Sequence, residues 1–358
     1  MFRNYSYNPK DRTDRHTFEI HDVDISIING IRRVMLTDIP IPGIIGEDDP
    51  TVQIIKSNGP LHNEIIAHRI GLIPVCLTEE EIENYEDNSI NIELNLTNNT
   101  INMMNITTSD IKGTYNDKDI SKSDLEKMFP VNEVSKRGIL ITRLRSNETL
   151  HFKASVVKKT ARFNAAFCPV SLANFFNIQD PVLAAKKDSI LDKERAFYTN
   201  KFGEANVVQF EIESINNLIG PKYLIIKSIE IIINKFEDFI ANIVSEGLGF
   251  NGVTLKQFDQ LENTYEFNIQ NEDDTIGNII QSIIHNKYVR SEKKIKDDIN
   301  CSYIGYICPH PLKTELIVRV TLENQTDPKT FIKFMQANCI NIINELTLIK
   351  TEWSKFMK

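Results

Sequence analysis

The sequence predicts an α+β protein in which two related strand–helix halves form an intramolecular pseudo-dimer, with a β-rich domain inserted in the first half. Three observations lead to this prediction. A strand–turn–helix pattern near the N-terminus recurs late in the chain, and each copy ends in a long amphipathic helix. The residues that interrupt the first copy alternate in polarity, as strands do.

Length and composition limit the possible functions. The chain has 358 residues, enough for two or three domains, and its 41 basic and 49 acidic residues give a net charge of −8. A dedicated nucleic-acid binder would carry a basic excess. The five cysteines form no CxxC pair, which argues against a disulfide framework or a four-cysteine zinc site. No apolar run approaches 18 residues, so we expect no membrane span and a cytoplasmic location.

A short strand followed by a helix is predicted near the N-terminus. Phe18 and Ile20 alternate with polar residues, and a pattern of helical spacing runs from Asp24 until Pro40. Its apolar positions are Ile27, Ile28, Ile31, Val34 and Met35. Gly30 lies in the middle of this helix, where glycine costs about 1 kcal/mol relative to alanine. A close contact with another helix would explain it.

The same pattern returns in the second half of the chain. Phe267 and Ile276 follow Phe18 and Ile27 at a constant distance of 249 residues. Each copy ends in a long helix whose apolar residues step by three and four, as in a heptad seam. The first seam is Ile225, Ile229, Ile232, Phe236, Phe239 and Ile243, and the second includes Met335, Ile342, Leu346, Ile349 and Trp353.

Each seam needs an apolar partner. The two copies can pack on each other as a pseudo-twofold dimer within one chain, which we favour, or each seam can cover its own sheet. The first arrangement gives a first half interrupted by an insertion, a glycine-rich linker and a second half. The predicted bounds are 1–48 and 205–246 for the first half, 49–204 for the inserted domain, 247–257 for the linker and 258–358 for the second half.

Charged stretches mark the inserted domain. Residues 79–93 carry seven acidic and no basic side chains, and residues 136–162 carry eight basic side chains against one acidic one. Residues 61–70 are predicted as a helix, and residues 139–157 as a hairpin.

Two motifs of the first part of the chain resemble a known family. The segment NGIRRVMLTDIP over residues 29–40 looks like the N-x-L-R-R helix of the α-like subunits of cellular RNA polymerases. The segment LHNEIIAHRIGLIPV over residues 61–75 resembles their A-H-R-L-G-L-I-P signature. A weaker likeness covers residues 158–169, where Asn164 stands in place of the family's histidine.

The second half resembles the smaller, L-type partner of the same family. The segments DDTIGNII over residues 273–280 and YIGYICPHPL over residues 303–312 match its D-H-T-L-G-N-L-L and F-A-G-Y-x-x-P-H-P-L motifs. The matching residues are Thr275, Gly277, Asn278, Gly305, Tyr306, Pro309, His310 and Pro311. The resemblance implies a third-largest (archaeal D-type) subunit fused to its L-type partner, as in large cytoplasmic DNA viruses.

The resemblance also implies a role. The protein would be a non-catalytic assembly subunit of a multisubunit DNA-directed RNA polymerase that docks the largest and second-largest subunits. Small zinc-ribbon-like subunits are further candidate partners, and DNA and RNA would be contacted only through the complex. The implied docking residues are Asn29, Arg32, Arg33, His68 and Arg69. A viral protein would reside in the viral factory and the virion, and the nucleus is the alternative location.

No cofactor or metal is expected. Many members of the family hold a metal through a cysteine cluster after the L-I-P segment, and here residues 76–99 contain Cys76 alone. From the residues alone two other functions stay open. A metal-dependent enzyme would need His62, His68, Cys308 and His310 to converge. An independent nucleic-acid-binding module would use residues 136–162, although a partner's acidic surface or a solvated face also accounts for that charge.

Overall fold

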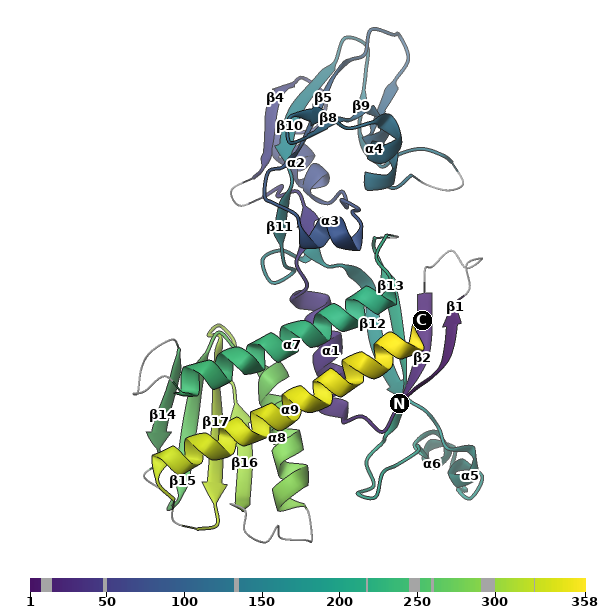
Figure 1. Ribbon diagram of the computed structural model, residues 1–358. Helices are drawn as coiled ribbons and strands as arrows, with labels where there is room; N and C mark the ends of the chain where they lie inside the picture. The colour runs from purple at the N-terminus through teal and green to yellow at the C-terminus, as the bar shows by residue number, and fades with distance from the viewer. Residues whose placement is uncertain are drawn as a thin grey trace.

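The protein consists of a lower body with the two longest helices and two sheets, and an upper body of shorter strands (Figure 1). The computed structural model describes residues 1–7, 15–47, 50–131, 135–216, 218–244, 252–258, 261–290, 300–324 and 326–358. Both chain ends lie in the lower body, so the upper body is an insertion from which the chain returns.

A four-stranded antiparallel sheet organises the first half. Its strand order is β1-β2-β13-β12, so strands from distant parts of the sequence lie side by side. Phe18 of β2 pairs with Phe210 of β13, and both side chains are buried. The elements are β1 (Phe2–Tyr7), β2 (Arg15–His21), α1 (Ile25–Thr37), β12 (Val170–Asn177), β13 (Val207–Ser214) and α7 (Pro221–Val244).

The second half repeats this arrangement. Its sheet has the order β14-β15-β17-β16, again antiparallel throughout, and Phe267 pairs with Val318 at the position equivalent to Phe18 and Phe210. The repeat in the sequence is therefore a repeat in topology. The elements are β14 (Val253–Gln257), β15 (Thr264–Gln270), α8 (Asp274–Ile284), β16 (Cys301–Ile307), β17 (Glu315–Leu322) and α9 (Pro328–Phe356).

Helix α1 forms where the sequence predicts it. Asp24 caps its N-terminus by accepting a hydrogen bond from the backbone N–H of Ser26, and the predicted apolar positions are buried. The contact expected at Gly30 exists, because a Cβ atom there would stand 2.8 Å from Cδ1 of Ile279 in α8. Glycine is tolerated in this helix because it lets α8 approach closely.

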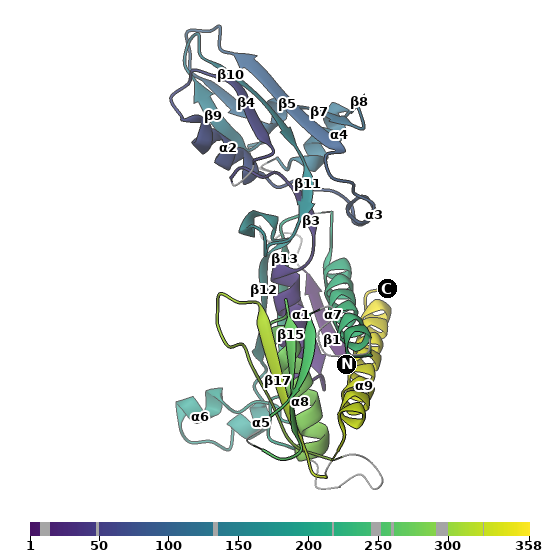
Figure 2. The ribbon, with the colours of Figure 1, turned by 90° about the vertical axis from the view of Figure 1, so that its left-hand side faces the viewer.

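The long helices α7 and α9 pack against each other, and Figure 2 shows both on the same side of the sheets. Every seam residue predicted for them is buried. Each helix also reaches the sheet of the other half: the ring of Phe239 in α7 lies 6.1 Å from that of Phe267, and the ring of Trp353 in α9 lies 4.5 Å from that of Phe18. One continuous core thus joins the two halves.

The upper body is built around a five-stranded sheet with the order β4-β10-β5-β7-β8 and a two-stranded sheet of β6 and β9. Strands β3 and β11 pair in the stem that leads to it. Its elements are β3 (Ile41–Gly43), β4 (Val52–Ser57), α2 (Asn63–Gly71), α3 (Glu79–Glu83), β5 (Ile90–Thr97), β6 (Met104–Thr107), β7 (Lys112–Tyr115), β8 (Lys118–Asp119), α4 (Lys122–Met128), β9 (Leu140–Leu144), β10 (Thr149–Ser155) and β11 (Val157–Lys159).

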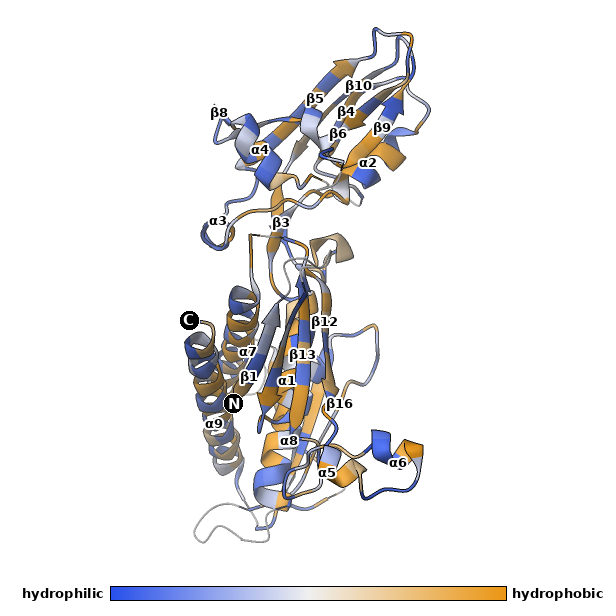
Figure 3. Cartoon of the chain, turned by 90° about the vertical axis from the view of Figure 1, so that its right-hand side faces the viewer, coloured by the Kyte–Doolittle hydropathy of each residue, from blue (hydrophilic) through white to orange (hydrophobic). Residues whose placement is uncertain are grey.

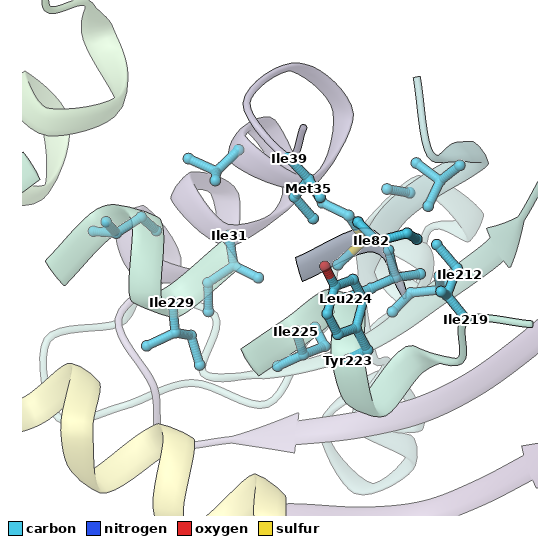
Figure 4. Packing of buried hydrophobic residues seen from close by; sticks show 14 of the residues in the cluster. Ile31, Met35, Ile39, Ile82, Ile212, Ile219, Tyr223, Leu224, Ile225 and Ile229 are labelled. Atoms are coloured by element: carbon cyan, nitrogen blue, oxygen red, sulfur yellow. The ribbon is translucent and has the colours of Figure 1, made fainter. Parts of the chain in front are cut away.

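Helix α3 attaches the upper body to α7. Ile82 is buried among residues of α1 and α7 (Figure 4), although it lies in the acidic stretch 79–93. The next residue, Glu83, accepts hydrogen bonds from Tyr223 and Lys227, each at 2.7 Å. Burial, with the bond to Glu83, raises the pKa of Tyr223 far above its ordinary value. The acidic stretch is therefore partly a contact with the lower body.

Three local predictions are corrected. Residues 139–157 do not form a hairpin, because β9 pairs with β6 while β10 lies between β4 and β5. Strand β12, placed in the inserted domain at 49–204, belongs to the sheet of the first half. The predicted linker 247–257 includes β14, which pairs with β15, and residues 245–251 lie outside the described residues. In each case pairing between distant segments decides the outcome.

Candidate functional site

Helices α1 and α8 meet at the centre of the lower body through equivalent residues. Asp24 and Asp273 are 249 positions apart, and each caps its helix through the residue two positions later, Ser26 or Thr275. The two helices therefore begin in the same way, and they pack against each other.

The side chains between these helices contact each other reciprocally. Arg33 Nε donates to Thr275 Oγ1 at 3.0 Å, and Arg33 Nη2 lies 3.6 Å from Asp273 Oδ2. Ser282, the equivalent of Arg33, donates to Asp24, the equivalent of Asp273, at 2.9 Å. Residues at corresponding positions of the repeat therefore contact each other in both directions.

A charge network surrounds Asp273. Arg162, which follows the stem strand β11, bridges Asp273 and Asp38 at the end of α1. Lys235 of α7 lies 3.6 Å from Asp38 and 3.0 Å from Glu272. The network joins α1, α7, the start of α8 and the segment that returns from the upper body. No sequence motif indicates this network, although Arg162 ends the basic stretch 136–162.

Burial and hydrogen bonding have opposite effects on the pKa values of Asp273 and Glu272. Burial alone would raise the pKa of Asp273, but hydrogen bonds from Thr275 and Arg162 outweigh it and hold the pKa far below 3.8. At Glu272 burial prevails and raises the pKa, even with Lys235 beside it. Asp273 is thus fixed as a carboxylate that binds two arginines.

The predicted docking residues of α1 separate into two roles. Arg33 lies between the halves, as described above, and is engaged inside the chain. Arg32 Nε donates to Asn29 Oδ1 at 3.0 Å, and among the described residues no carboxylate pairs with its guanidinium. Burial and the charge of Arg33 lower the pKa of Arg32. Arg32 is therefore the member of the pair that has donors available for another protein.

The predicted docking residues of α2 also differ from each other. Arg69 donates to the carbonyl oxygens of Leu140 and Ile141, both at 2.8 Å, so it ties α2 to β9 within the upper body. His68 is exposed and lies 3.4 Å from Glu47. The sequence motif predicts the same role for both residues, because strand β9, which Arg69 binds, lies outside the motif.

Four of the L-type motif residues lie where α8 and β16 pack together. A Cβ atom at Gly277 would stand 2.6 Å from the ring of Tyr306, so only glycine fits there. Gly305 likewise faces the side chain of Tyr303, and Thr275 is buried. Asn278 lines a cavity at the other side of α8. Pro309, His310 and Pro311 form an exposed turn in which His310 Nδ1 accepts from the backbone N–H of Leu312 at 3.1 Å.

The residues proposed for metal or acid–base chemistry do not converge. His62 and His68 belong to the upper body, whereas Cys308 and His310 follow β16 in the lower body. Within the described ranges no three His, Cys, Asp or Glu side chains are grouped closely enough to hold a metal ion. No helix in the described part of the chain has the length and apolarity needed to cross a membrane.

The basic stretch 136–162 is not one surface. Its residues lie before β9, on β9, in the turn that follows it, on β10 and β11, and in the segment after β11. Lys153 Nζ lies 3.8 Å from Glu93, the ammonium group of Lys158 donates to the carbonyl oxygen of Ile82, and Arg162 binds Asp38 and Asp273. Its charge is therefore partly used in contacts within the chain.

Comparison with known proteins points to one group. Residues 264–348, from β15 into α9, match the profile of the RNA polymerase Rpb3/Rpb11 dimerisation domain. The DNA-directed RNA polymerases II, IV and V subunit 3 of Arabidopsis thaliana is 26% identical over 199 residues, which cover 51% of this chain and 60% of the plant protein.

Shorter matches extend the same similarity. The DNA-directed RNA polymerase subunit Rpo3 of Methanosphaera stadtmanae is 42% identical over 62 residues, or 17% of this chain and 21% of the archaeal protein. The DNA-directed RNA polymerase II subunit rpb3 of Dictyostelium discoideum is 35% identical over 74 residues, or 21% of this chain and 22% of that protein. The chain thus spans less than two thirds of the length of each of these relatives.

Proposed function

We propose that this chain is a non-catalytic assembly subunit of a multisubunit DNA-directed RNA polymerase. The observation that carries the proposal is the duplicated lower body, whose second copy matches a polymerase dimerisation domain. A protein in this role positions other subunits and catalyses no reaction itself. It holds two unlike outer faces in a fixed relation, and the largest and second-largest subunits assemble on them.

We propose further that the lower body is an intramolecular pseudo-dimer. The equal strand order of the two sheets, the reciprocal contacts between α1 and α8 and the exchange of long helices between sheets support this. Joining two halves in one chain replaces a bimolecular encounter by an intramolecular one, which raises their effective concentration to roughly the millimolar range. Pairing of the halves would then be independent of protein concentration.

The two halves correspond in this proposal to a D-type subunit and its L-type partner. The first half would comprise residues 1–43 and 157–244, the inserted domain residues 44–156, and the second half residues 252–358, following the observed strand pairing. A fusion of this kind fits a large cytoplasmic DNA virus, with the viral factory and the virion as locations. The nucleus is the location if the polymerase is cellular.

The proposed docking surface for the second-largest subunit centres on Asn29 and Arg32, with His68 of the upper body as a further member. A guanidinium offers forked hydrogen bonds to carboxylates or backbone carbonyls of a partner. Arg33 and Arg69 act inside the chain and support this surface without belonging to it. The second half would receive the largest subunit, and small zinc-ribbon-like subunits remain candidate partners.

Native co-purification tests this role. Tagged wild-type chain, expressed with its polymerase, is expected to retain both large subunits, whereas Arg32→Ala loses the second-largest one. Arg143→Ala, which removes an exposed arginine on β9, is the matched control and keeps both. Thermal unfolding of each purified variant checks that the fold is intact. Retention of both large subunits by a folded Arg32→Ala variant would contradict the proposed docking surface, and their absence from wild-type preparations would contradict the proposed function.

A further inference from the structure

The loop that joins β5 to β6 lies at the free end of the upper body. Strand β10 leads directly into β11 of the stem, and Thr149 at the opposite end of β10 pairs with Thr97, the last residue of β5. The loop that follows Thr97 therefore lies at the end opposite the stem, where Figure 3 shows hydrophobic colour on an exposed loop. We call this loop, residues 98–103, the finger.

One buried side chain holds the finger in a fixed shape. Asn98 is fully buried, and its Nδ2 donates to the carbonyl oxygens of Asn102 at 2.8 Å and Leu144 at 2.9 Å. Its Oδ1 accepts from the backbone N–H and the hydroxyl group of Thr100, at 2.9 Å and 2.7 Å. An asparagine amide can make four hydrogen bonds, and here all four are formed. Asn98 therefore fixes the finger and joins it to the end of β9.

The tip of the finger is apolar. Ile101 is 97% exposed and Met103 is 61% exposed. Substitutions at side chains that are so exposed usually change stability little, so the fold itself does not explain an isoleucine at this place. An apolar side chain that stands on a rigid loop loses little conformational entropy when it enters a pocket of another protein. The finger thus has the properties of a preorganised anchor for binding.

The charge beside the finger is positive. Residues 98–107 and 140–147, which contain the finger, β6 and β9, include Arg143 and Arg145 and no acidic residue. Both arginines are exposed, and no carboxylate in the described part of the chain forms an ion pair with either guanidinium. The next acid along the chain, Glu148, accepts the backbone N–H of Arg145 at 2.7 Å. These two arginines therefore belong to the part of the basic stretch that is available to a partner.

We propose that the finger inserts Ile101 into an apolar pocket of another protein, and that Arg145 donates to acidic side chains at the rim of this pocket. Leu144, which accepts the hydrogen bond from Asn98, precedes Arg145, so the anchor and the cation lie side by side. Charge complementarity selects a partner with an acidic rim. A guanidinium can bind a carboxylate there through two parallel hydrogen bonds.

Other occupants fit the finger less well. Binding of single-stranded nucleic acid relies on aromatic side chains on which bases stack, and residues 98–107 and 140–147 contain none. A bilayer requires no fixed loop shape, and two apolar side chains bury too little surface for stable membrane binding. The finger lies at the end of the upper body opposite the stem, whereas Arg32 lies in the lower body. The proposal is therefore separate from the docking surface around Arg32 and does not depend on it.

Site-specific photo-crosslinking tests the proposal. The photoreactive amino acid benzoylphenylalanine replaces Met103 in the tagged full chain, which is isolated under native conditions with its bound proteins and then irradiated. We expect one cross-linked segment of another protein, with an Asp or Glu close to the cross-link. The same amino acid at Tyr115, an exposed residue of β7, is the control position and should not give this product. A failure to cross-link any other protein at Met103 would overturn the proposal.

Variants of the cross-linking chain test the two parts of the contact. Ile101→Ser and Arg145→Glu are each expected to lower the cross-linking yield about tenfold. Lys118→Glu, a charge reversal at an exposed residue of β8, should have no effect. Changing the acid beside the cross-link to Lys in the partner should restore the yield of Arg145→Glu. Thermal unfolding of each variant should match wild type. A yield that neither Ile101→Ser nor Arg145→Glu lowers would overturn the proposal.

Two defined probes test the other occupants on the purified full chain. Vesicles of phosphatidylcholine with phosphatidylserine, and a single-stranded DNA oligonucleotide, are each expected not to bind through the finger. Binding of either probe that is lost in Ile101→Ser would assign the finger to a membrane or to nucleic acid and overturn the proposal. None of these outcomes bears on the polymerase role, which the co-purification of the large subunits tests.

Discussion

Gly30 of α1 lies against Ile279 of α8, and the two residues hold the same position in the two copies of the repeated pattern, 249 residues apart. In a twofold arrangement, residues that contact their own equivalents lie at the axis. In the pseudo-dimer that we propose, this contact would mark where the twofold axis passes through the lower body. The two copies carry different residues at this position, because the glycine of the first copy leaves room for the isoleucine of the second.

Gly277→Ala is expected to lower the free energy of unfolding by about 1–3 kcal/mol, the usual cost of overpacking. The new Cβ would stand 2.6 Å and 2.8 Å from atoms of the Tyr306 ring and 2.8 Å from Leu316. Urea unfolding measures the change. Gly220→Ala is the control, because nothing lies within 4 Å of its Cβ position. Equal stabilities of the two variants would show that α8 and β16 are less tightly packed than described.

Trp353→Ala is expected to cost about 3–5 kcal/mol, because it empties a fully buried site. The indole ring contacts Phe2 and Phe18 of the first sheet although it belongs to the second half of the chain. Leu348→Ala on the same helix, at a side chain 54% exposed, is expected to change stability by less than about 0.5 kcal/mol. If both substitutions cost the same, α9 does not reach the first sheet.

Asp273→Asn is expected to lower stability at neutral pH by roughly 1.5–3 kcal/mol, since hydrogen bonds to a charged group are lost while asparagine keeps the helix cap. The pKa of Asp273 is held below its ordinary value of 3.8, so its contribution is complete above that pH and declines as the pH falls below it. The difference from wild type should therefore be smaller at about pH 3 than at pH 7.

Urea unfolding at both pH values measures this difference. Asp188→Asn, at an exposed residue between α5 (Pro181–Ala184) and α6 (Ile190–Glu194), serves as the control and should match wild type at both pH values. A difference between wild type and Asp273→Asn that is constant with pH would mean that the carboxylate charge contributes nothing.

Arg69→Ala is expected to loosen the upper body locally. The substitution leaves the carbonyl oxygens of Leu140 and Ile141 without their donor, so amide hydrogen exchange should accelerate in α2 and β9. The lower body should be unaffected, and Arg143→Ala on the exposed side of β9 should leave exchange near that of wild type. Unchanged exchange in α2 would instead favour Arg69 as a residue that serves an external partner.

Much of the fold can be predicted from local sequence patterns. Helix α1 could be predicted from Asp24 and the apolar spacing that follows, and both long helices from their seams, because amphipathic periodicity reports directly which face is buried. The repeat was also detectable, since Phe18 and Phe267 keep the same sequence context.

Non-local pairing could not be predicted in the same way. Strand β12 was assigned to the wrong body and residues 139–157 to a hairpin, because a strand's own sequence does not specify its neighbour. The roles of Arg33 and Arg162 could not be predicted from the sequence for a related reason. Both bind Asp273, and the distance along the chain to that acid exceeds 100 residues.

Residue patterns along the chain are enough to identify two copies of one strand–helix arrangement, an apolar seam on the long helix of each copy, and a charged, β-rich segment that interrupts the first copy. The carboxylate that each arginine binds, and the sheet that each strand joins, become visible only in the folded chain. The physical reason is that burial periodicity is a property of neighbouring residues, whereas ion pairs and strand partners depend on the positions that distant segments reach after folding.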